Sequence, residues 1–241
     1  MTGDARIAPW SAHGRGFASI EKMRRVFMSK REAGDHAEMI RVWDPIVRIG
    51  HWLLVAAFAI AYLSEGEPEW LHSWSGYVIG IVVAIRIIWG IIGTRHARFT
   101  DFVTGPFKAT GYLVSLFTGS AERHIGHSPP GGLMTIALLI MLAATTGSGM
   151  VLLAVDEGRG PLAGIVTAQT FGGVTSAISS LEDSDEGEAG DGGEEVFEEI
   201  HEVTANLTLA LVIFHVLGVI LASVSHRENL SRAMITGMKR R

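Results

Sequence analysis

The sequence predicts an all-α membrane protein, a bundle of four transmembrane helices. The 241-residue chain is 48% hydrophobic and has a mean hydropathy of +0.30, which is more apolar than an ordinary soluble domain. Four apolar stretches are each long enough to cross a bilayer, which takes about 20 helical residues. Basic residues gather in alternate segments between these stretches, as they do in a protein that crosses a membrane several times.

The four predicted spans are the apolar stretches at residues 46–63, 70–93, 131–155 and 197–225. Arg41 and Trp43 lie just before the first of them, as anchors at a membrane surface do. The polar connection at 94–130 contains FTDFVTGPFKATGYLVSLF, which Asp101 and Pro106 interrupt. This connection therefore predicts a short interfacial helix rather than a fifth span.

Two polar regions complete the predicted domain organisation. Residues 1–40 predict a polar cytoplasmic extension, followed by the membrane domain at 41–241. Residues 156–196 form a Gly-rich loop that is very acidic between residues 182 and 195. In the extension, four apolar residues at helical spacing fit either an amphipathic helix on an anionic leaflet or a solvated tail. These four are Phe17, Ile20, Met23 and Phe27.

The distribution of charge predicts the topology. Almost all Lys and Arg lie in the N-terminal segment, the 94–130 connection and the C-terminal tail, whereas the 156–196 loop holds only Arg159. Because basic loops stay on the cytoplasmic side, both termini and the 94–130 connection are expected in the cytoplasm. The acidic loop is then expected on the periplasmic side.

The last span carries two histidines, His201 and His215, which lie fourteen residues apart. Fourteen residues at about 100° each end about 40° short of four full turns, so both imidazoles leave nearly the same face, roughly 21 Å apart along the axis. An ionisable side chain inside a span is costly and indicates function. The pattern fits a helix that ligates two stacked haems, or two polar core histidines that bond neighbouring helices.

Two further histidines match these two depths. The first span enters from the cytoplasm and places His51 near that side, level with His215, whereas the second span begins at the periplasmic edge with His72, level with His201. Two bis-histidine sites are therefore predicted. Iron with two axial imidazoles has no open coordination position, so such a haem transfers electrons rather than binding oxygen. The chain has no cysteine, which excludes iron–sulfur clusters, cysteine-bound zinc and covalently attached haem.

Arg86 is the fifth candidate site residue. It follows His72 by fourteen residues on the same predicted helix, so it shares the face of His72 and the depth of His51 and His215. A buried arginine needs an anion, and a haem propionate suits its bidentate fork. The alternative is an arginine that extends to the cytoplasmic headgroups. Small residues that fit either a flat macrocycle or close helix packing are Gly76, Gly80, Gly218 and Ala222.

Several motifs together resemble the bacterial cytochrome b561 family, which includes the b-type cytochrome subunits of membrane-bound nickel–iron hydrogenases. They are RVWDPIVRIGHWLL, LHSWSGYVIGIVVAIRIIWGIIG, RFTDFVTGPFKATGYL, GHSPPGGLMTIALLIML and EEIHEVTANLTLALVIFHVLGVILASVSHRENLSRAMITGMKR. The resemblance runs from about residue 39 to the C-terminus. It implies a four-helix cytochrome of the bacterial inner membrane with two b haems, held by His51/His215 on the cytoplasmic side and His72/His201 on the periplasmic side.

The resemblance also implies the activity, which is electron transfer across the bilayer between the quinone pool and a partner redox protein. The acidic 156–196 loop is expected either to dock a basic partner such as a c-type cytochrome or to be a solvated loop. The quinone site is left open between the cytoplasmic end, near Arg48 and His226, and the periplasmic end, near Trp70 and Glu202. A second copy of the chain is kept as a candidate partner and a nucleic acid is not expected. No catalytic residue is assigned, and whether the chain oxidises quinol or reduces quinone stays open.

Two other functions compete with this prediction. The chain could be a haem-bearing membrane anchor subunit of a larger oxidoreductase such as a hydrogenase, or a transporter that uses its histidines as ion sites. The transporter is disfavoured because the third span has only Thr and Ser among apolar residues. The remaining histidines are expected in a turn, at a helix end or on the surface; they are His127, His226, His13, His36, His96 and His124.

Overall fold

The computed structural model describes residues 21–25, 39–64, 67–118, 120–166 and 192–240. The chain divides into two units, residues 1–40 with 239–241, and residues 41–238. In the first unit, residues 21–25 are helical and Arg25 bonds Glu21 at 3.1 Å. Of the predicted amphipathic helix, Phe17, Ile20 and Phe27 lie outside the described residues, as does most of the predicted acidic loop.

The second unit is built on four long apolar helices. They are α2 (Pro45–Ser64), α3 (Glu69–Ile92), α6 (Pro129–Asp156) and α8 (Gly192–His226). Each is long and apolar enough to cross a membrane, so the predicted all-α fold with four spans is confirmed. The largest difference from the predicted bounds is at the start of α8, where the helix already includes acidic residues that were predicted to end the loop.

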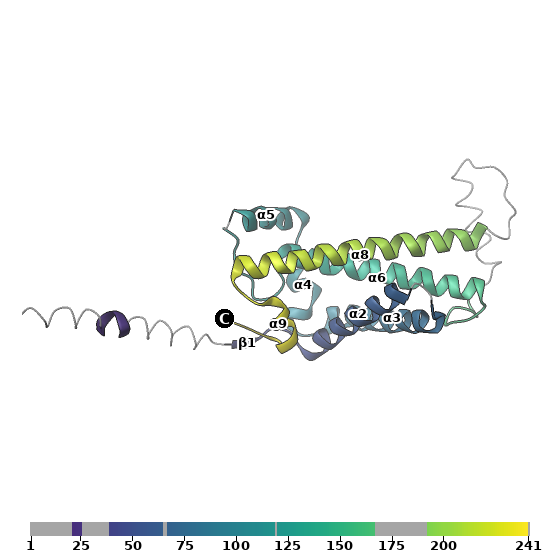
Figure 1. The fold of residues 1–241 in the computed structure, drawn as a ribbon, viewed down its shortest axis with the longest axis horizontal. Helices are drawn as coiled ribbons and strands as arrows, with labels where there is room; N and C mark the ends of the chain where they lie inside the picture. Colours follow the sequence, from purple (N-terminus) through teal and green to yellow (C-terminus); the bar gives the residue numbers. More distant parts are fainter. Residues whose placement is uncertain (1–20, 26–38, 65–66, 119, 167–191, 241) are drawn as a thin grey trace, which may run out of the picture. The chain divides into compact units, whose positions relative to one another are not determined.

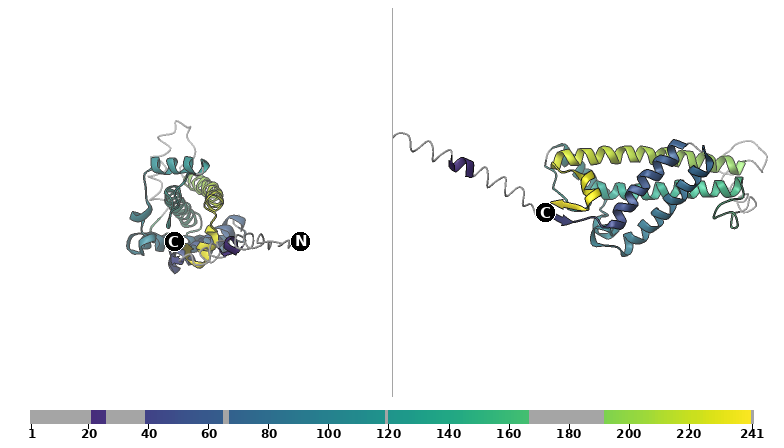
Figure 2. Two further views of the ribbon diagram at one scale, coloured as in Figure 1. Left: turned by 90° about the vertical axis from the view of Figure 1, so that its left-hand side faces the viewer. Right: turned by 60° about the horizontal axis from the view of Figure 1, so that its bottom comes forward.

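The four helices form two antiparallel pairs (Figures 1 and 2). α2 lies along α3 and α6 lies along α8, while α3 also packs against α6. Among the described residues, α8 has few close backbone approaches to α2 and α3. A small core joins α2, α3 and α6 through Ala57, Ile79, Val83, Leu139 and Leu142. The outward faces expose Ile, Leu and Phe side chains, as a lipid-facing surface requires.

The connection between α3 and α6 contains three short helices rather than the single one predicted. They are η1 (Arg95–Ala97), α4 (Phe99–Phe102) and α5 (Pro106–Phe117). Pro106 explains the break before α5, because proline is favoured at the first position of a helix and disfavours helical backbone in the residue before it. Phe107 in α5 is 90% exposed, which suits an interfacial helix that presents an aromatic side chain to headgroups.

The C-terminal tail adds a capped helix, α9 (Leu230–Thr236). The Asn229 side chain accepts a hydrogen bond from the Arg232 amide at 2.7 Å, and Gly237 ends the helix with a φ of 79°. The side chain of Arg48 in α2 donates to the carbonyl of Ile235 near the end of α9. Two short strands, β1 (Met39–Arg41) and β2 (Met238–Arg240), pair in a two-stranded sheet.

Asp44 joins the start of α2 to the end of α3. Its carboxylate accepts hydrogen bonds from the Val47 amide at 3.0 Å, from Trp89 Nε1 at 3.0 Å and from the Thr94 hydroxyl at 2.6 Å. Burial alone would raise the pKa of Asp44, but hydrogen bonds from Thr94, Trp89 and the backbone outweigh it and lower the pKa below the ordinary value. The neighbouring Trp43 was predicted as a surface anchor, but this is wrong, because it is buried with its ring 4.7 Å from that of His127.

Substitution Asp44→Asn is expected to destabilise the protein at pH 7 by about 1–3 kcal/mol, because an amide cannot accept all three hydrogen bonds. The folded-state pKa of Asp44 lies below the unfolded value. Its contribution is therefore fully present above the unfolded pKa of about 3.9 and is lost as pH falls through the folded-state pKa. Thermal unfolding in detergent at several pH values should show the gap between the two proteins narrowing only below about pH 4.

The substitution Thr94→Val is a control, because it keeps the carboxylate but removes one donor. It should move the acid limb of the stability curve to higher pH, since fewer hydrogen bonds then favour the charged form. Equal stability of the wild type and Asp44→Asn at pH 7 would contradict this role for Asp44.

Candidate functional site

Two pairs of histidines face each other across the bundle. The ring centroids of His72 on α3 and His201 on α8 are 5.9 Å apart, with an interplanar angle of 75°. Those of His51 on α2 and His215 on α8 are 6.4 Å apart, at 53°. The structure thus brings together the same partners that matching by depth predicts. Whether these residues are ligands stays a prediction.

The separation within each pair suits a single metal ion between two imidazoles. An imidazole nitrogen binds a metal at about 2.0–2.1 Å, as on zinc, which puts the ring centroids of two opposed ligands about 6 Å apart. Within the described ranges, no group of three or more His, Asp or Glu side chains could hold a metal ion. Two imidazoles alone leave a bare ion under-coordinated, so a metal that brings its own equatorial ligands fits these pairs best.

Hydrogen bonds orient the pair formed by His72 and His201. Nδ1 of His72 lies 2.9 Å from the carbonyl oxygen of Ala61, and Nδ1 of His201 lies 2.9 Å from that of Thr145. A carbonyl can only accept, so both Nδ1 atoms carry the proton and donate. This leaves both Nε2 atoms with a free lone pair. Metal-binding histidines in proteins are held in this way.

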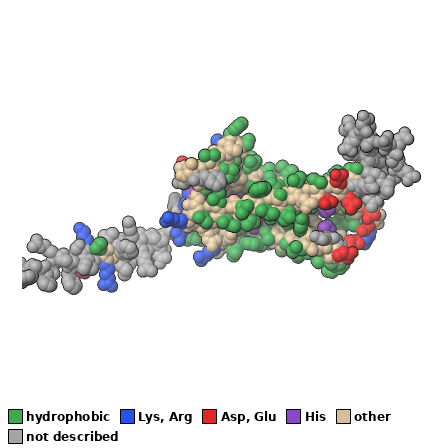
Figure 3. Space-filling model, turned by 45° about the horizontal axis from the view of Figure 1, so that its top comes forward, with side chains coloured by type: hydrophobic (Ala, Val, Ile, Leu, Met, Phe, Trp, Pro, Cys, Tyr) green, Lys and Arg blue, Asp and Glu red, His purple; other side chains and the backbone are tan. Residues whose placement is uncertain are grey.

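A cavity of about 630 Å³ opens beside this pair, and both imidazoles line it. Gly76 also lines it, and a Cβ at Gly76 would meet no atom within 4 Å. Its rim is acidic, and we call this the acidic end of the bundle; the carboxylates in its lining are Glu69, Asp156, Glu157, Glu198 and Glu202. Figure 3 shows acidic side chains gathered at that end, with histidine among them. Arg159 bonds Glu69 at 2.9 Å and also bonds Glu157.

The second pair, His51 and His215, lies toward the opposite end, which we call the basic end. Here α2 begins and α3 and α8 end, and the arginines at these helix ends are Arg48, Arg95, Arg98 and Arg123, the last of which pairs with Glu228 just after α8. Figure 3 shows basic side chains gathered at that end. His51 is half-buried and its ring lies 5.2 Å from that of Trp52. Its Nδ1 is buried and has no hydrogen-bond partner in the part of the chain that the structure describes. Beyond His215, a Cβ at Gly218 would meet no atom within 4 Å, which leaves space along α8.

Arg86 is buried, with 9% of its surface exposed, rather than extended to the membrane surface. Its guanidinium carbon lies 5.1 Å from the ring centroid of Phe99 and 6.0 Å from that of Phe102. Both Nη atoms are buried and have no hydrogen-bond partner among the described residues. Asp44 interacts with it only electrostatically, since no ion pair joins them and the hydrogen bonds described above occupy the Asp44 oxygens. The guanidinium therefore has two buried donor nitrogens that no acceptor in the described part of the chain pairs.

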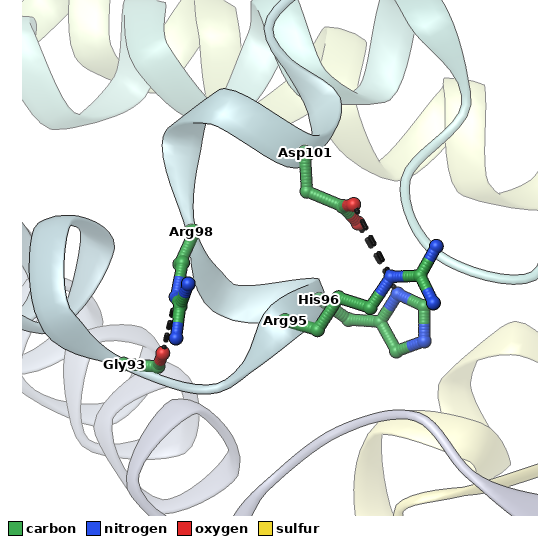
Figure 4. Close-up of polar contacts among 5 residues, drawn as sticks. All are labelled: Gly93, Arg95, His96, Arg98 and Asp101. Carbon is green, nitrogen blue, oxygen red and sulfur yellow. Dashed lines mark hydrogen bonds and ion pairs between the residues drawn. The ribbon is translucent and has the colours of Figure 1, made fainter.

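The segment before Phe99 and Phe102 is fixed by local polar contacts (Figure 4). Arg98 turns back and donates from Nε to the carbonyl of Gly93 at 2.7 Å. Asp101 binds Nδ1 of His96 at 3.3 Å and lies 3.8 Å from Nε of Arg95. These contacts hold α4 against the end of α3. They explain why the two phenylalanine rings stay over Arg86.

The remaining histidines lie outside the two pairs. His127 packs its ring 4.1 Å from that of Phe102, just before α6, where a turn was predicted. His226 ends α8, and its Nε2 lies 2.9 Å from the hydroxyl of Tyr112 on α5. His96 and His124 were predicted at the surface, but both are half-buried because Asp101 contacts one and the Tyr112 ring contacts the other. His13 and His36 lie outside the described residues.

A four-helix membrane bundle with two imidazole pairs along one helix has the architecture of a b-type membrane cytochrome. The comparison with known families agrees: the family model for prokaryotic cytochrome b561 matches residues 42–237. The chain belongs to this family, and it is a multi-pass bacterial membrane protein that binds haem b and transfers electrons. Neither the curated proteins nor the solved structures that were compared gave a match.

The residues present fit haem b. Each imidazole pair has the separation that one iron needs, and Gly76 leaves the cavity wall open. Arg86 presents two buried Nη atoms that have no partner among the described residues and that suit a propionate. Sequence reasoning missed the two residues of α6 that contact His201, which are Thr145 and Ser148. The signal was the run TTGSG at 145–149, which interrupts an otherwise apolar span with small and polar residues.

Proposed function

We propose that this chain is a dihaem cytochrome that carries electrons across the bilayer between the quinone pool and a partner redox protein. The main support is the pair of imidazole pairs, with centroids 5.9 and 6.4 Å apart, on one continuous helix. Haem b between two imidazoles supplies reversible one-electron transfer and has no open position for oxygen. The roughly 21 Å between His201 and His215 along α8 puts one site toward each membrane surface.

In this proposal each histidine has a defined task. His72 and His201 hold one haem at the acidic end, and His51 and His215 hold the other toward the basic end. Arg86 binds a propionate of the second haem through its two Nη atoms. This assignment is supported by its burial and by Val82, one turn away on α3, which packs against Gly50 beside His51; a Cβ at Gly50 would lie 3.3 Å from Val82 Cγ1.

The charges suggest the orientation and the partner. Because positive residues favour the cytoplasm, we assign the basic end to that side, both termini likewise to the cytoplasm, and the acidic end to the periplasm. The carboxylates of the acidic end surround the cavity that His72 and His201 line. A basic redox protein such as a c-type cytochrome would be steered to this rim by long-range attraction, which salt screens.

The proposal is tested by the haem content of the purified full-length protein. A pyridine haemochrome assay with a low-temperature reduced spectrum should give two non-covalent b haems per chain, both low-spin in each oxidation state. Reduction by a short-chain quinol should then follow. One haem per chain would contradict one of the two pairs, and none in folded, haem-supplied protein would overturn the proposal. Co-purification with a larger redox subunit and little activity alone would favour the anchor subunit.

A further inference from the structure

Helix α6 supplies none of the predicted ligands, yet it makes most of the polar contacts of His201. Nδ1 of His201 lies 2.9 Å from the carbonyl oxygen of Thr145 and 3.2 Å from the hydroxyl oxygen of Ser148. The Ser148 hydroxyl is itself 3.0 Å from the Thr145 carbonyl and donates to it. One imidazole N–H therefore points into a small polar site made by a single turn of α6.

Gly149 makes this approach possible. In a helix the carbonyl of residue 145 faces the amide of residue 149, so a group that reaches this carbonyl from outside passes close to the Gly149 Cα. A Cβ at Gly149 would lie 2.8 Å from Cε1 of His201 and 3.1 Å from its Nδ1. These distances are too short for a methyl group beside a rigid ring. An alanine at this position would therefore displace the imidazole.

The register between α6 and α8 is fixed next to this contact. Thr208, two turns beyond His201, is fully buried, and its hydroxyl lies 3.2 Å from that of Thr145. Among the described elements, α6 also makes the most extensive backbone contact with α8. His201 thus stands on a part of α8 that α6 holds in place, and its side chain has little freedom to turn.

The two histidine pairs differ in this respect. Both members of the acidic-end pair donate from Nδ1 to a backbone carbonyl, and His201 gains the Ser148 hydroxyl in addition. In the other pair, Nδ1 of His51 has no partner among the described residues. An imidazole that donates to a strong acceptor becomes a more basic ligand at its other nitrogen. A more basic axial ligand favours the oxidised metal and lowers its reduction potential.

We infer that Ser148 and Gly149 of α6 are positioning residues for His201, which fix its tautomer and ring position and lower the reduction potential of the haem at the acidic end. The inference rests on the proposed ligation by His72 and His201. It assigns a redox role to the one span that carries no predicted ligand. Neither residue touches the haem in this role, since each acts through the imidazole.

The steric part is tested by Gly149→Ala in the full-length, haem-supplied protein, with Gly147→Ala as the matched control. Gly147 lies on the same turn of α6, but a Cβ there would meet no atom within 4 Å. Gly149→Ala should lose one of two haems or convert it to a high-spin form, and the other haem should stay low-spin. Gly147→Ala should keep two low-spin haems. Equal behaviour of the two variants would overturn the steric part.

The hydrogen-bond part is tested by Ser148→Ala, which leaves the packing nearly unchanged. A potentiometric titration should show an upward shift of one midpoint potential, with two low-spin haems retained and the other midpoint unmoved. Ser148→Thr keeps the hydroxyl and should restore the wild-type value. Two unmoved midpoints in Ser148→Ala would overturn this part. A wild-type protein without two haems would instead contradict the proposed function itself.

Discussion

The double variant His72→Ala/His201→Ala is expected to keep one low-spin haem per chain, whereas His72→Ala/His215→Ala should keep none. The first variant removes both imidazoles from one pair and leaves His51 and His215 intact, 6.4 Å apart. The second leaves each site with a single imidazole. Because a bis-imidazole site depends on both of its ligands, losses within one pair are strongly non-additive and losses across pairs are not.

This comparison tests the pairing rather than the mere presence of histidine. Haem per chain is measured by pyridine haemochrome, and size-exclusion chromatography in detergent selects the folded protein. The variant His96→Ala is a suitable control, because His96 lies in η1, contacts Asp101 of α4 and belongs to neither pair. Equal haem content in the two double variants would mean that the partners have been assigned wrongly.

The substitution Arg86→Met is expected to destabilise the haem-loaded protein and to lower one midpoint potential. If a propionate pairs with the guanidinium, removal of the guanidinium leaves a buried anion uncompensated, at a cost of about 3–5 kcal/mol. The loss of a nearby positive charge also favours the oxidised state of the haem, which lowers its potential. Thermal unfolding of the loaded protein and a potentiometric titration measure these two effects.

The same substitution should stabilise the haem-loaded protein if Arg86 faces no anion. Both Nη atoms lack partners among the described residues, so an uncharged side chain of similar length would then relieve a buried, unpaired cation. A more stable loaded protein would therefore exclude the propionate contact. Arg86→Lys separates charge from geometry, because lysine keeps the positive charge but cannot form a bidentate pair. The midpoint potential of Arg86→Lys should stay close to the wild-type value, whereas its stability should fall between those of the wild type and Arg86→Met.

The spans and the histidine pairs could be predicted from the sequence because both follow from regular helix geometry. A helix that crosses the bilayer has a fixed rise and rotation per residue, so the spacing of His201 and His215 determines their relative depth and face. Depth then selects His72 and His51 as the partners that the structure brings close. The face and depth of Arg86 follow by the same reasoning, since it lies fourteen residues after His72 on one helix. Its burial does not, because the spacing fits equally an arginine that extends to the headgroups.

Contacts that depend on tertiary packing could not be predicted in this way. Asp44 precedes a proline and a span, but nothing local reveals that Trp89 and Thr94 donate to it. Trp43 has the residue type and the position, just before a span, of a surface anchor, yet its ring packs inward against His127. Thr145 and Ser148 stand out as polar residues in an apolar span. Only the register between α6 and α8 decides that they meet His201.

The two antiparallel helix pairs have a consequence for biogenesis. α2–α3 and α6–α8 are each closely packed, and apart from the contact of α3 with α6 the two hairpins face each other mainly across the histidine pairs. Each histidine pair takes one residue from each hairpin, so neither hairpin alone contains a complete pair. A cofactor that binds such a split site contributes its binding free energy to assembly. The supply of cofactor would then decide how much newly made chain reaches a compact form and how much is left to membrane proteases.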